Sequence, residues 1–169
     1  MSIATTLRRW WKKLYTKMVS EKATPEYIAR GWAIGMFYGC FIPFGVQLIV
    51  SIPTAFVLKG SKIGATLGTL ITNHFTIFII YPIQCYVGNK LIGGKLGYSE
   101  VVKAMADLVK NQDFSTLAKL SWELIISFFA GGALLTAVMT PLTYILVKKL
   151  VVTRQESKKR RMLAKSANR

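Results

Sequence analysis

GWAIGMFYGCFIPFGVQLIVSIPTAFVL, residues 31–58, contains no Asp, Glu, Lys or Arg. The segments 63–89 and 124–147 are also free of these charged residues. Each segment is longer than the roughly 20 residues that a helix needs to cross the hydrocarbon core of a bilayer. A buried helix of a soluble protein is usually shorter and carries a polar stripe. The three segments therefore predict an all-α integral membrane protein.

The charged residues lie outside these apolar segments. The chain of 169 residues has a mean hydropathy of +0.38 and yet a net charge of +16. Residues 1–30 hold seven Lys or Arg and residues 148–169 hold nine, whereas 90–123 holds five against four Asp or Glu. Because an excess of Lys and Arg marks the cytoplasmic side, we expect both termini to be cytoplasmic and 90–123 to lie outside.

Three complete spans would place the two termini on opposite sides, so one apolar segment should not cross. Segment 31–58 is the best candidate, because Pro43 and Gly45 interrupt it near its centre and favour a helix break. A re-entrant pair of half-helices would keep Lys59 and Lys62 cytoplasmic. In the alternative, 31–58 and 63–89 both span fully, and Lys59 and Lys62 face outward.

The remaining sequence divides around these segments. Residues 1–23 have apolar residues at helical spacing among basic ones, which is typical of a helix on a membrane surface. Its expected contacts with anionic lipid headgroups come from Arg8, Arg9, Lys12, Lys13 and Lys17. Basic residues beside membrane segments orient the protein in the bilayer. This role accounts for the positive charge, so we expect no nucleic-acid partner.

Residues 24–93 should form a membrane core that contains two broken helical segments. Thr24-Pro25-Glu26 predicts the start of its first helix, with Thr24 as the cap and Pro25 at the first helical position. Residues 94–113 should carry an outer amphipathic helix. A final membrane helix is expected over 114–152, beginning near Phe114, followed by a frayed basic cytoplasmic tail over 153–169.

Two series of glycines have the same spacing of four residues, which places them on one face of a helix. They are Gly31, Gly35 and Gly39, and then Gly60, Gly64 and Gly68. Such small residues let helix backbones approach closely in lipid. The series are offset by 29 residues, and each leads towards a break, so they read as two copies of one half-helix design. Internal repeats with broken helices are typical of transporter sites, although glycines at this spacing also serve packing alone.

A few polar residues lie within the apolar segments and should face the protein interior. Gln47, Asn73 and His74 are the candidate ligand-binding residues, because they flank the expected breaks. Each could equally serve as a helix cap or an interhelical hydrogen bond. Gln84 is interpreted as an interhelical hydrogen bond, and Pro82 is a further expected helix break.

The apolar segments contain no carboxylate, which leaves no pair for acid–base catalysis within the membrane. One histidine without a neighbouring Asp or Cys does not favour a nucleophile triad or a metal site. Cys40 and Cys85 both lie in apolar segments and read as small core residues. We therefore expect no enzyme activity, no cofactor and no metal.

Two stretches between Pro25 and Gly93 resemble a bacterial membrane family catalogued as domain of unknown function 2062. They are TPEYIARGWAIGMFYGCFIPFGVQ and ATLGTLITNHFTIFIIYPIQCYVGNKL. The positions that fit its pattern are Ala29, Gly31, Ala33, Gly35, Phe37, Gly39, Pro43, Gly45, Gln47, Asn73 and Gly88. His74 departs from the pattern, since Pro is usual after the Asn, and Lys59-Gly60-Ser61 stands near a usual Arg-x-Asn.

The resemblance implies a protein of the bacterial cytoplasmic membrane and supplies no activity. Some relatives look joined to glycosyltransferase-like domains, which suggests work on envelope glycolipid or polysaccharide. Two functions are therefore expected. One is a transporter- or flippase-like protein for an envelope lipid or small solute. The other is a non-transporting scaffold or accessory subunit, with a homo-oligomer or an envelope-synthesis protein as its partner.

Overall fold

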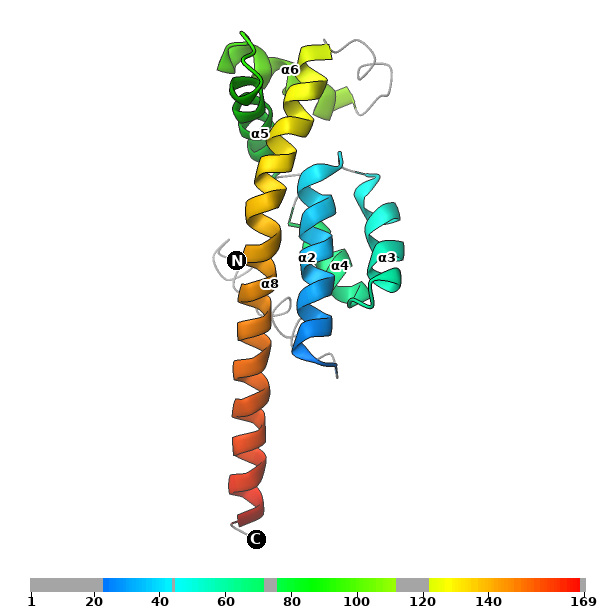
Figure 1. The fold of residues 1–169 in the computed structure, drawn as a ribbon, viewed down its shortest axis with the longest axis vertical. Helices are drawn as coiled ribbons and strands as arrows, with labels where there is room; N and C mark the ends of the chain where they lie inside the picture. The colour runs from blue at the N-terminus through cyan, green and yellow to red at the C-terminus, as the bar shows by residue number, and fades with distance from the viewer. Residues whose placement is uncertain (1–22, 44, 72–75, 112–121, 168–169) are drawn as a thin grey trace, which may run out of the picture.

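The computed structural model describes residues 23–43, 45–71, 76–111 and 122–167, and every regular element within them is a helix. The helices are α2 (Pro25–Phe41), α3 (Gln47–Val57), α4 (Lys62–Thr69), α5 (Ile77–Leu91), α6 (Tyr98–Asn111) and α8 (Trp122–Ala167). Figure 1 shows α8 as a spine along the whole molecule, with α2 beside its middle and α5 and α6 at its first turns. The predicted all-α class is confirmed for the described residues.

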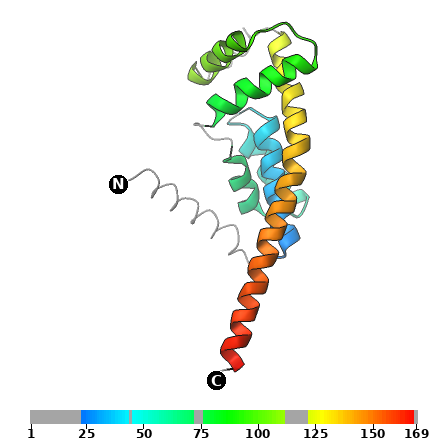
Figure 2. The same ribbon diagram turned by 90° about the vertical axis from the view of Figure 1, so that its left-hand side faces the viewer.

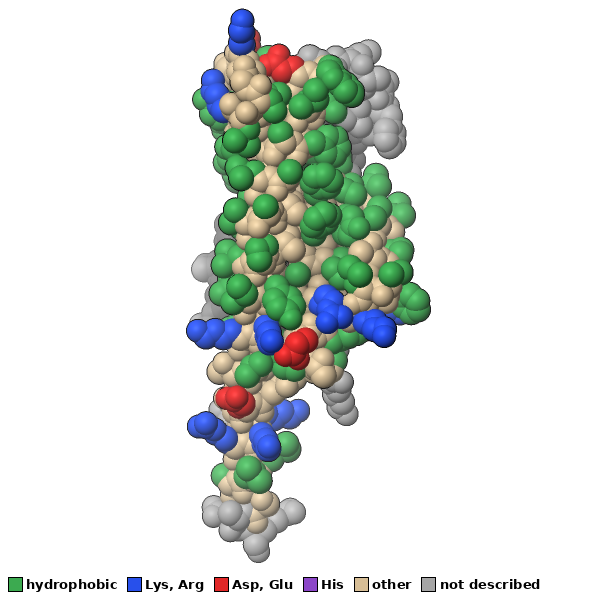
Figure 3. Space-filling model, in the orientation of Figure 1, with side chains coloured by type: hydrophobic (Ala, Val, Ile, Leu, Met, Phe, Trp, Pro, Cys, Tyr) green, Lys and Arg blue, Asp and Glu red, His purple; other side chains and the backbone are tan. Residues whose placement is uncertain are grey.

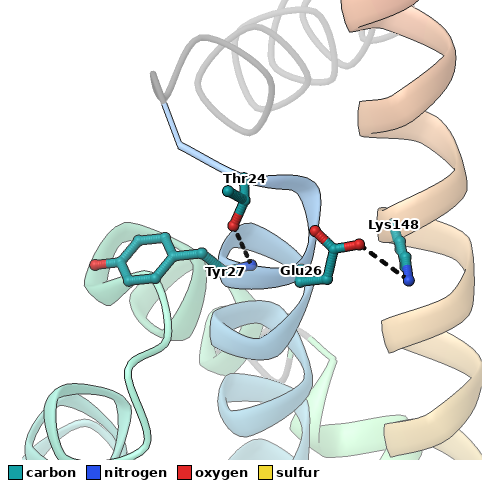
Figure 4. Close-up of polar contacts among 4 residues, drawn as sticks. All are labelled: Thr24, Glu26, Tyr27 and Lys148. Carbon is teal, nitrogen blue, oxygen red and sulfur yellow. Dashed lines mark hydrogen bonds and ion pairs between the residues drawn. The ribbon is translucent and has the colours of Figure 1, made fainter.

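Helix α2 begins as its sequence predicts. The Thr24 hydroxyl accepts a hydrogen bond of 3.3 Å from the Tyr27 backbone N–H, and Pro25 occupies the first helical position, where no N–H is needed. Glu26, in the first turn, pairs with Lys148 of α8 at 3.1 Å. Figure 4 shows both contacts. The ion pair places the start of α2 level with Lys148, the first residue after the uncharged segment 124–147 of α8.

The first apolar segment doubles back on itself. Helix α2 ends before Ile42, whose backbone is extended, and Gly45 has a φ of 103°, a conformation that favours glycine. Helix α3 then returns towards the start of α2, as Figure 1 shows. Its end is held there, because Arg30 of α2 donates a hydrogen bond of 2.9 Å to the Leu58 carbonyl. The two ends of segment 31–58 therefore lie at the same end of the molecule.

The second apolar segment is divided into α4 and α5, with the interruption between Thr69 and Ile77. Helix α4 packs on α2 and α3, whereas α5 packs on α8 and α6. The expectation that Pro82 breaks a helix is wrong, because α5 continues through Pro82 to Leu91. Pro82 lies in the sixth position of α5, where its ring removes one backbone hydrogen bond and the packing against α8 keeps the helix continuous.

The idea of two matching glycine half-helices is only partly right. Gly31 lies in the middle of α2, whereas Gly60 precedes α4, whose cap is Ser61. An alanine Cβ at Gly31 would lie against the Ser61 carbonyl, and one at Gly35 against the Ala65 carbonyl. The two series thus face each other across the α2–α4 contact. Gly39, Gly64 and Gly68 are buried.

Three apolar clusters hold the helices together. One joins α5, α6 and α8 through Tyr81, Val101 and Phe128. A second joins α2 to α8 through Trp32 and Val147, and a third joins α2, α3 and α4 around Ala55. The backbones of α5 and α8 approach each other even more closely than those of α2 and α4. They do so at Gly88 and Gly131, where a Cβ on either glycine would meet the backbone of the other helix.

Helix α8 is the one described helix that is long and apolar enough to cross a membrane, judged by length and composition. It does not end at Val152, so the expectation of a frayed tail over 153–169 is wrong up to Ala167. Lys, Arg, Glu and Ala are good helix formers, and the apolar helix before them removes the cost of nucleation. Helix α6 falls within the expected outer helix 94–113, and residues 112–121, including Phe114, lie outside the described residues.

Large apolar side chains cover much of the surface between two charged levels. Figure 3 shows them on α3 and the middle of α8, with Lys and Arg gathered below and a second charged group above. Ile49, Phe56 and Val57 of α3 are each about two-thirds or more exposed, at 72%, 67% and 73%. Exposed apolar surface on this scale marks an interaction site or a membrane-facing surface.

Candidate ligand site at the helix breaks

The start of α3 lies against the end of α4. The Gln47 Nε2 atom, in the first residue of α3, donates a hydrogen bond of 3.2 Å to the carbonyl of Thr69, the last residue of α4. One break precedes Gln47 and the other follows Thr69. The contact therefore joins two points that are separated by 22 residues in sequence.

Polar side chains are buried where these breaks meet. Gln47 is 1% exposed, and Ser51 and Thr69 are fully buried. The Thr69 hydroxyl donates to the Thr66 carbonyl at 2.8 Å. The Ser51 hydroxyl has no hydrogen-bond partner among the described residues. A buried hydroxyl without a hydrogen-bond partner costs free energy. The Ser51 hydroxyl could therefore donate a hydrogen bond to a bound polar group or accept one from it.

Sequence reasoning identified Gln47 but missed Ser51 and Thr69. Ser51 stands one helical turn after Gln47, so its spacing could have placed it on the same face. Thr69 could not have been found, because the contact between the two breaks depends on the return of α3. Asn73 and His74, the other predicted ligand-binding residues, lie outside the described residues, in the stretch between α4 and α5.

The helix ends give this region a mixed polar character. The C-terminal ends of α2 and α4 bring partial negative charge, and the N-terminal end of α3 brings partial positive charge. Helix α3 has no side-chain cap hydrogen bond at its start. Such ends can bind polar or ionic groups where water is excluded.

Gln84 forms the interhelical hydrogen bond that its sequence context predicts. It is 3% exposed, and its Nε2 atom donates to the Phe128 carbonyl of α8 at 3.1 Å. Pro43 and Gly45 lie in the break between α2 and α3, whereas Pro82 lies inside α5. The predicted lipid contacts Arg8, Arg9, Lys12, Lys13 and Lys17 lie outside the described residues.

A second polar cluster lies at the first turn of α8, and sequence reasoning missed it. The Asn89 Nδ2 atom donates to Glu123 Oε1 at 2.9 Å and to Ser127 Oγ at 3.1 Å. The Lys95 backbone N–H donates to the same Glu123 oxygen at 3.0 Å. Asn89 and then Lys95 hold the pKa of Glu123 below its ordinary value. The cluster joins α5 to α8 just before the uncharged segment 124–147.

Charges at the other end of this segment connect α2 to α8. The pKa of Glu26 is lowered by its own backbone N–H at the start of α2 and by Lys148, while Glu26 raises the pKa of Lys148. Among the described residues, no three His, Cys, Asp or Glu side chains are grouped to hold a metal ion. The described geometry therefore offers hydrogen-bonding groups and helix ends, rather than charged ligands, inside the apolar zone.

Comparison with known proteins supplies one match. The model of a family described as "Uncharacterized protein conserved in bacteria (DUF2062)" matches residues 8–160. No curated protein and no solved structure shows significant similarity to the chain.

Proposed function

Because the chain belongs to this bacterial family, DUF2062, we propose that it is a multi-pass protein of the cytoplasmic membrane that binds an envelope lipid or a small solute at its helix breaks. Its action would be transporter- or flippase-like. The observation that carries the proposal is the contact from Gln47 to Thr69, which brings both breaks together beside the buried hydroxyl of Ser51.

The lengths of the helices support a topology with a re-entrant hairpin. At about 1.5 Å per residue, the 11 residues of α3 extend roughly 16 Å, about half of the roughly 30 Å hydrocarbon core. Neither α4, with 8 residues, nor α5, with 15, reaches the roughly 20 residues of a complete span. Figure 2 shows α5 turned obliquely across α8, so α4 and α5 would together form one broken span. Helix α8 would be the return span.

This topology puts the helix breaks in the interior of the bilayer. The base of the α2–α3 hairpin carries Arg30 and Lys59, and Lys62 follows at the start of α4. Lys148 pairs with Glu26 at the same end of α2. These charges would lie at the cytoplasmic surface. Since α3 is too short to cross, the turn from α2 to α3 would lie inside the membrane, where backbone groups need protein or water partners.

A lipid-scrambling assay tests the proposal. The full chain is reconstituted into liposomes of phosphatidylethanolamine and phosphatidylglycerol that contain a fluorescent phospholipid, and dithionite is added outside. We expect bleaching to proceed beyond the outer-leaflet fraction. We expect the variant that combines Gln47→Ala, Asn73→Ala and His74→Ala to slow this phase.

Gln155→Ala is the matched control, because Gln155 is exposed near the cytoplasmic end, where it donates to the Ala23 carbonyl. If lipid is not the substrate, radiolabelled small solutes replace the fluorescent lipid in the same vesicles. The transport site is excluded if the triple variant keeps wild-type function and thermal stability.

The tight glycine contacts favour a second candidate, a membrane scaffold or accessory subunit. Gly35 against Ala65, and Gly88 against Gly131, bring backbones together for packing alone. A scaffold would expose a fixed apolar surface to a second copy or to an envelope-synthesis protein. Chemical crosslinking in native membranes separates the two functions, because a scaffold predicts a stable complex that the triple variant leaves intact.

A further inference from the structure

Three exposed cations lie beside the apolar outer face of α3, and we propose that they bind an anionic phospholipid of the cytoplasmic leaflet. The cations are Arg30 of α2, Lys59 of the connection from α3 to α4, and Lys62 of α4. They would hold the phosphate of the headgroup, and α3 would pack against an acyl chain. The inference rests on the proposed topology, because it needs this end of the molecule at the cytoplasmic surface.

Hydrogen bonds hold the first two cations together at the end of α3. The Arg30 Nη1 atom donates to the Leu58 carbonyl at 2.9 Å and to the Lys59 carbonyl at 3.5 Å. The Arg30 guanidinium therefore lies against the backbone from which the Lys59 side chain extends. A guanidinium has five N–H donors in one plane. Since Arg30 is exposed, the donors that face away from these carbonyls can bind a phosphate.

Lys62 stands where the apolar face of α3 ends. Its Nζ atom lies 4.7 Å from the centre of the Phe56 ring, which is a cation–π contact. Ile49 and Ile52 precede Phe56 by seven and four residues, and all three are exposed, so they share one face of the helix. This face extends about 10 Å from Phe56 along α3, in the direction that an acyl chain takes into the bilayer.

None of the three cations has a carboxylate partner among the described residues. Glu26, one turn before Arg30 on α2, pairs with Lys148 at 3.1 Å. Segment 31–89 contains no Asp or Glu. The cluster therefore carries positive charge that no described carboxylate neutralises, and the negative charge of a cytoplasmic leaflet complements it.

The backbone of Lys59 favours a role for its charge. Its φ of 51° is at a position where the end of a helix normally takes glycine. This conformation costs a non-glycine residue free energy, and strained residues of this kind gather at functional sites. Lysine in place of glycine thus adds a cation to the cluster at a cost in stability.

Lipid-dependent melting of the purified full chain in a neutral detergent tests the site. Dioctanoyl phosphatidylglycerol, dioctanoyl phosphatidylcholine and inorganic phosphate are titrated in separate series at equal ionic strength. We expect the Tm to rise and saturate at a lower concentration of phosphatidylglycerol than of phosphatidylcholine, because a ligand that binds the folded state stabilises it. Inorganic phosphate should give no saturating rise, because it lacks the acyl chain that packs on α3.

The variant that combines Lys59→Gln and Lys62→Gln removes two of the cations. We expect its apparent affinity for phosphatidylglycerol to fall about thirtyfold, roughly fivefold for each lysine near a membrane surface. Lys158→Gln with Lys159→Gln is the matched control, because it removes the same charge from exposed positions near the end of α8, and it should respond like the wild type. Both variants retain the basic segment 1–23, so its contacts with lipid cancel in the comparison.

The apolar half of the site is tested by Phe56→Ala. Phe56 is 67% exposed, so its removal should leave the fold intact, and we expect weaker binding of phosphatidylglycerol. Ile79→Ala is the control, because Ile79 is 65% exposed on α5, away from the three cations.

Equal affinity for the two phospholipids would overturn the site, and so would an unchanged response in the Lys59 and Lys62 variant or in Phe56→Ala. An equal loss in both lysine variants would show diffuse attraction to charge and would also overturn it. A saturating rise with inorganic phosphate would show an anion site that needs no lipid, with the same consequence. Failure here leaves the lipid-scrambling result untouched, whereas failure of scrambling with the expected lipid preference would leave the site standing without transport.

Discussion

Lys59 is a strained residue that connects α3 to α4. Among the described residues it is the one non-glycine with a positive φ, 51°. It follows the end of α3, where the N–H groups of Lys59 and Gly60 donate to the Phe56 and Ala55 carbonyls at 3.2 and 2.7 Å. This is the arrangement of a Schellman cap, which normally takes glycine at the left-handed position.

Lys59→Gly should therefore stabilise the folded protein. The left-handed conformation costs a non-glycine residue about 1–2 kcal/mol, and glycine avoids this cost. The greater freedom of glycine in the unfolded chain offsets about 0.5–1 kcal/mol of the gain. We expect a net gain of about 0.5–1 kcal/mol, measured as a higher Tm. Lys62→Gly, inside α4, serves as the control for loss of charge and should lower the Tm.

Gly35 is a residue at which a single methyl group should force two helices apart. Its Cβ would lie against the Ala65 carbonyl and 2.8 Å from the Gly68 Cα. Both neighbours are backbone, so α2 and α4 would have to separate. We expect Gly35→Ala to cost about 1–3 kcal/mol, seen as a lower Tm. Gly97→Ala should have little effect, because its Cβ meets only the Glu100 and Ser99 side chains, at 3.5 Å and beyond.

The hydrogen bonds between α5 and α8 respond to pH through Glu123. Its folded pKa lies below the ordinary carboxyl value of 4.5, first because of Asn89 and then because of the Lys95 N–H. A lowered folded pKa contributes stability that is present above the unfolded pKa. That stability is lost as the pH falls through the folded pKa.

We therefore expect the Tm of the wild type to fall below pH 4.5 more steeply than that of Glu123→Gln. The amide of the variant cannot gain a proton in this range, so its contribution is constant. Parallel curves for the two proteins between neutral pH and pH 3 would contradict this role of Glu123. The measurement is thermal melting in detergent across that range.

Sequence reasoning succeeded for elements whose signals are local. The cap at Thr24, the break at Pro43 and Gly45, and the interhelical role of Gln84 each follow from residue types at one position. It failed where packing decides, as at Pro82, which α5 accommodates. The length of α8 was also underestimated. Its apolar part already forms a helix, and the basic stretch that follows continues this helix to Ala167.

The candidate sites show the same division. Gln47 was predicted as a polar residue in an apolar segment, whereas its contact with Thr69 arises from the return of α3.

At the scale of the whole molecule, charge and helix length support the orientation proposed above. Arg30 holds the Leu58 carbonyl, and Lys148 pairs with Glu26, so the base of the α2–α3 hairpin and the end of the apolar part of α8 are level. Glu123, which accepts a hydrogen bond from the Lys95 N–H, lies in the first turn of α8, at the other end of its uncharged part, and Lys90 lies near the end of α5. In the proposed orientation, with the basic tails in the cytoplasm, the loop after α5 would face outward.

Cysteine labelling in intact bacteria tests this orientation. In a background without Cys40 and Cys85, both free and buried, Lys59→Cys should react with a membrane-impermeant maleimide only after the cells are opened. Gly97→Cys should react from outside, and Lys149→Cys should behave like Lys59→Cys. Labelling of position 59 in intact cells would mean that 31–58 crosses completely. The re-entrant topology would then have to be abandoned.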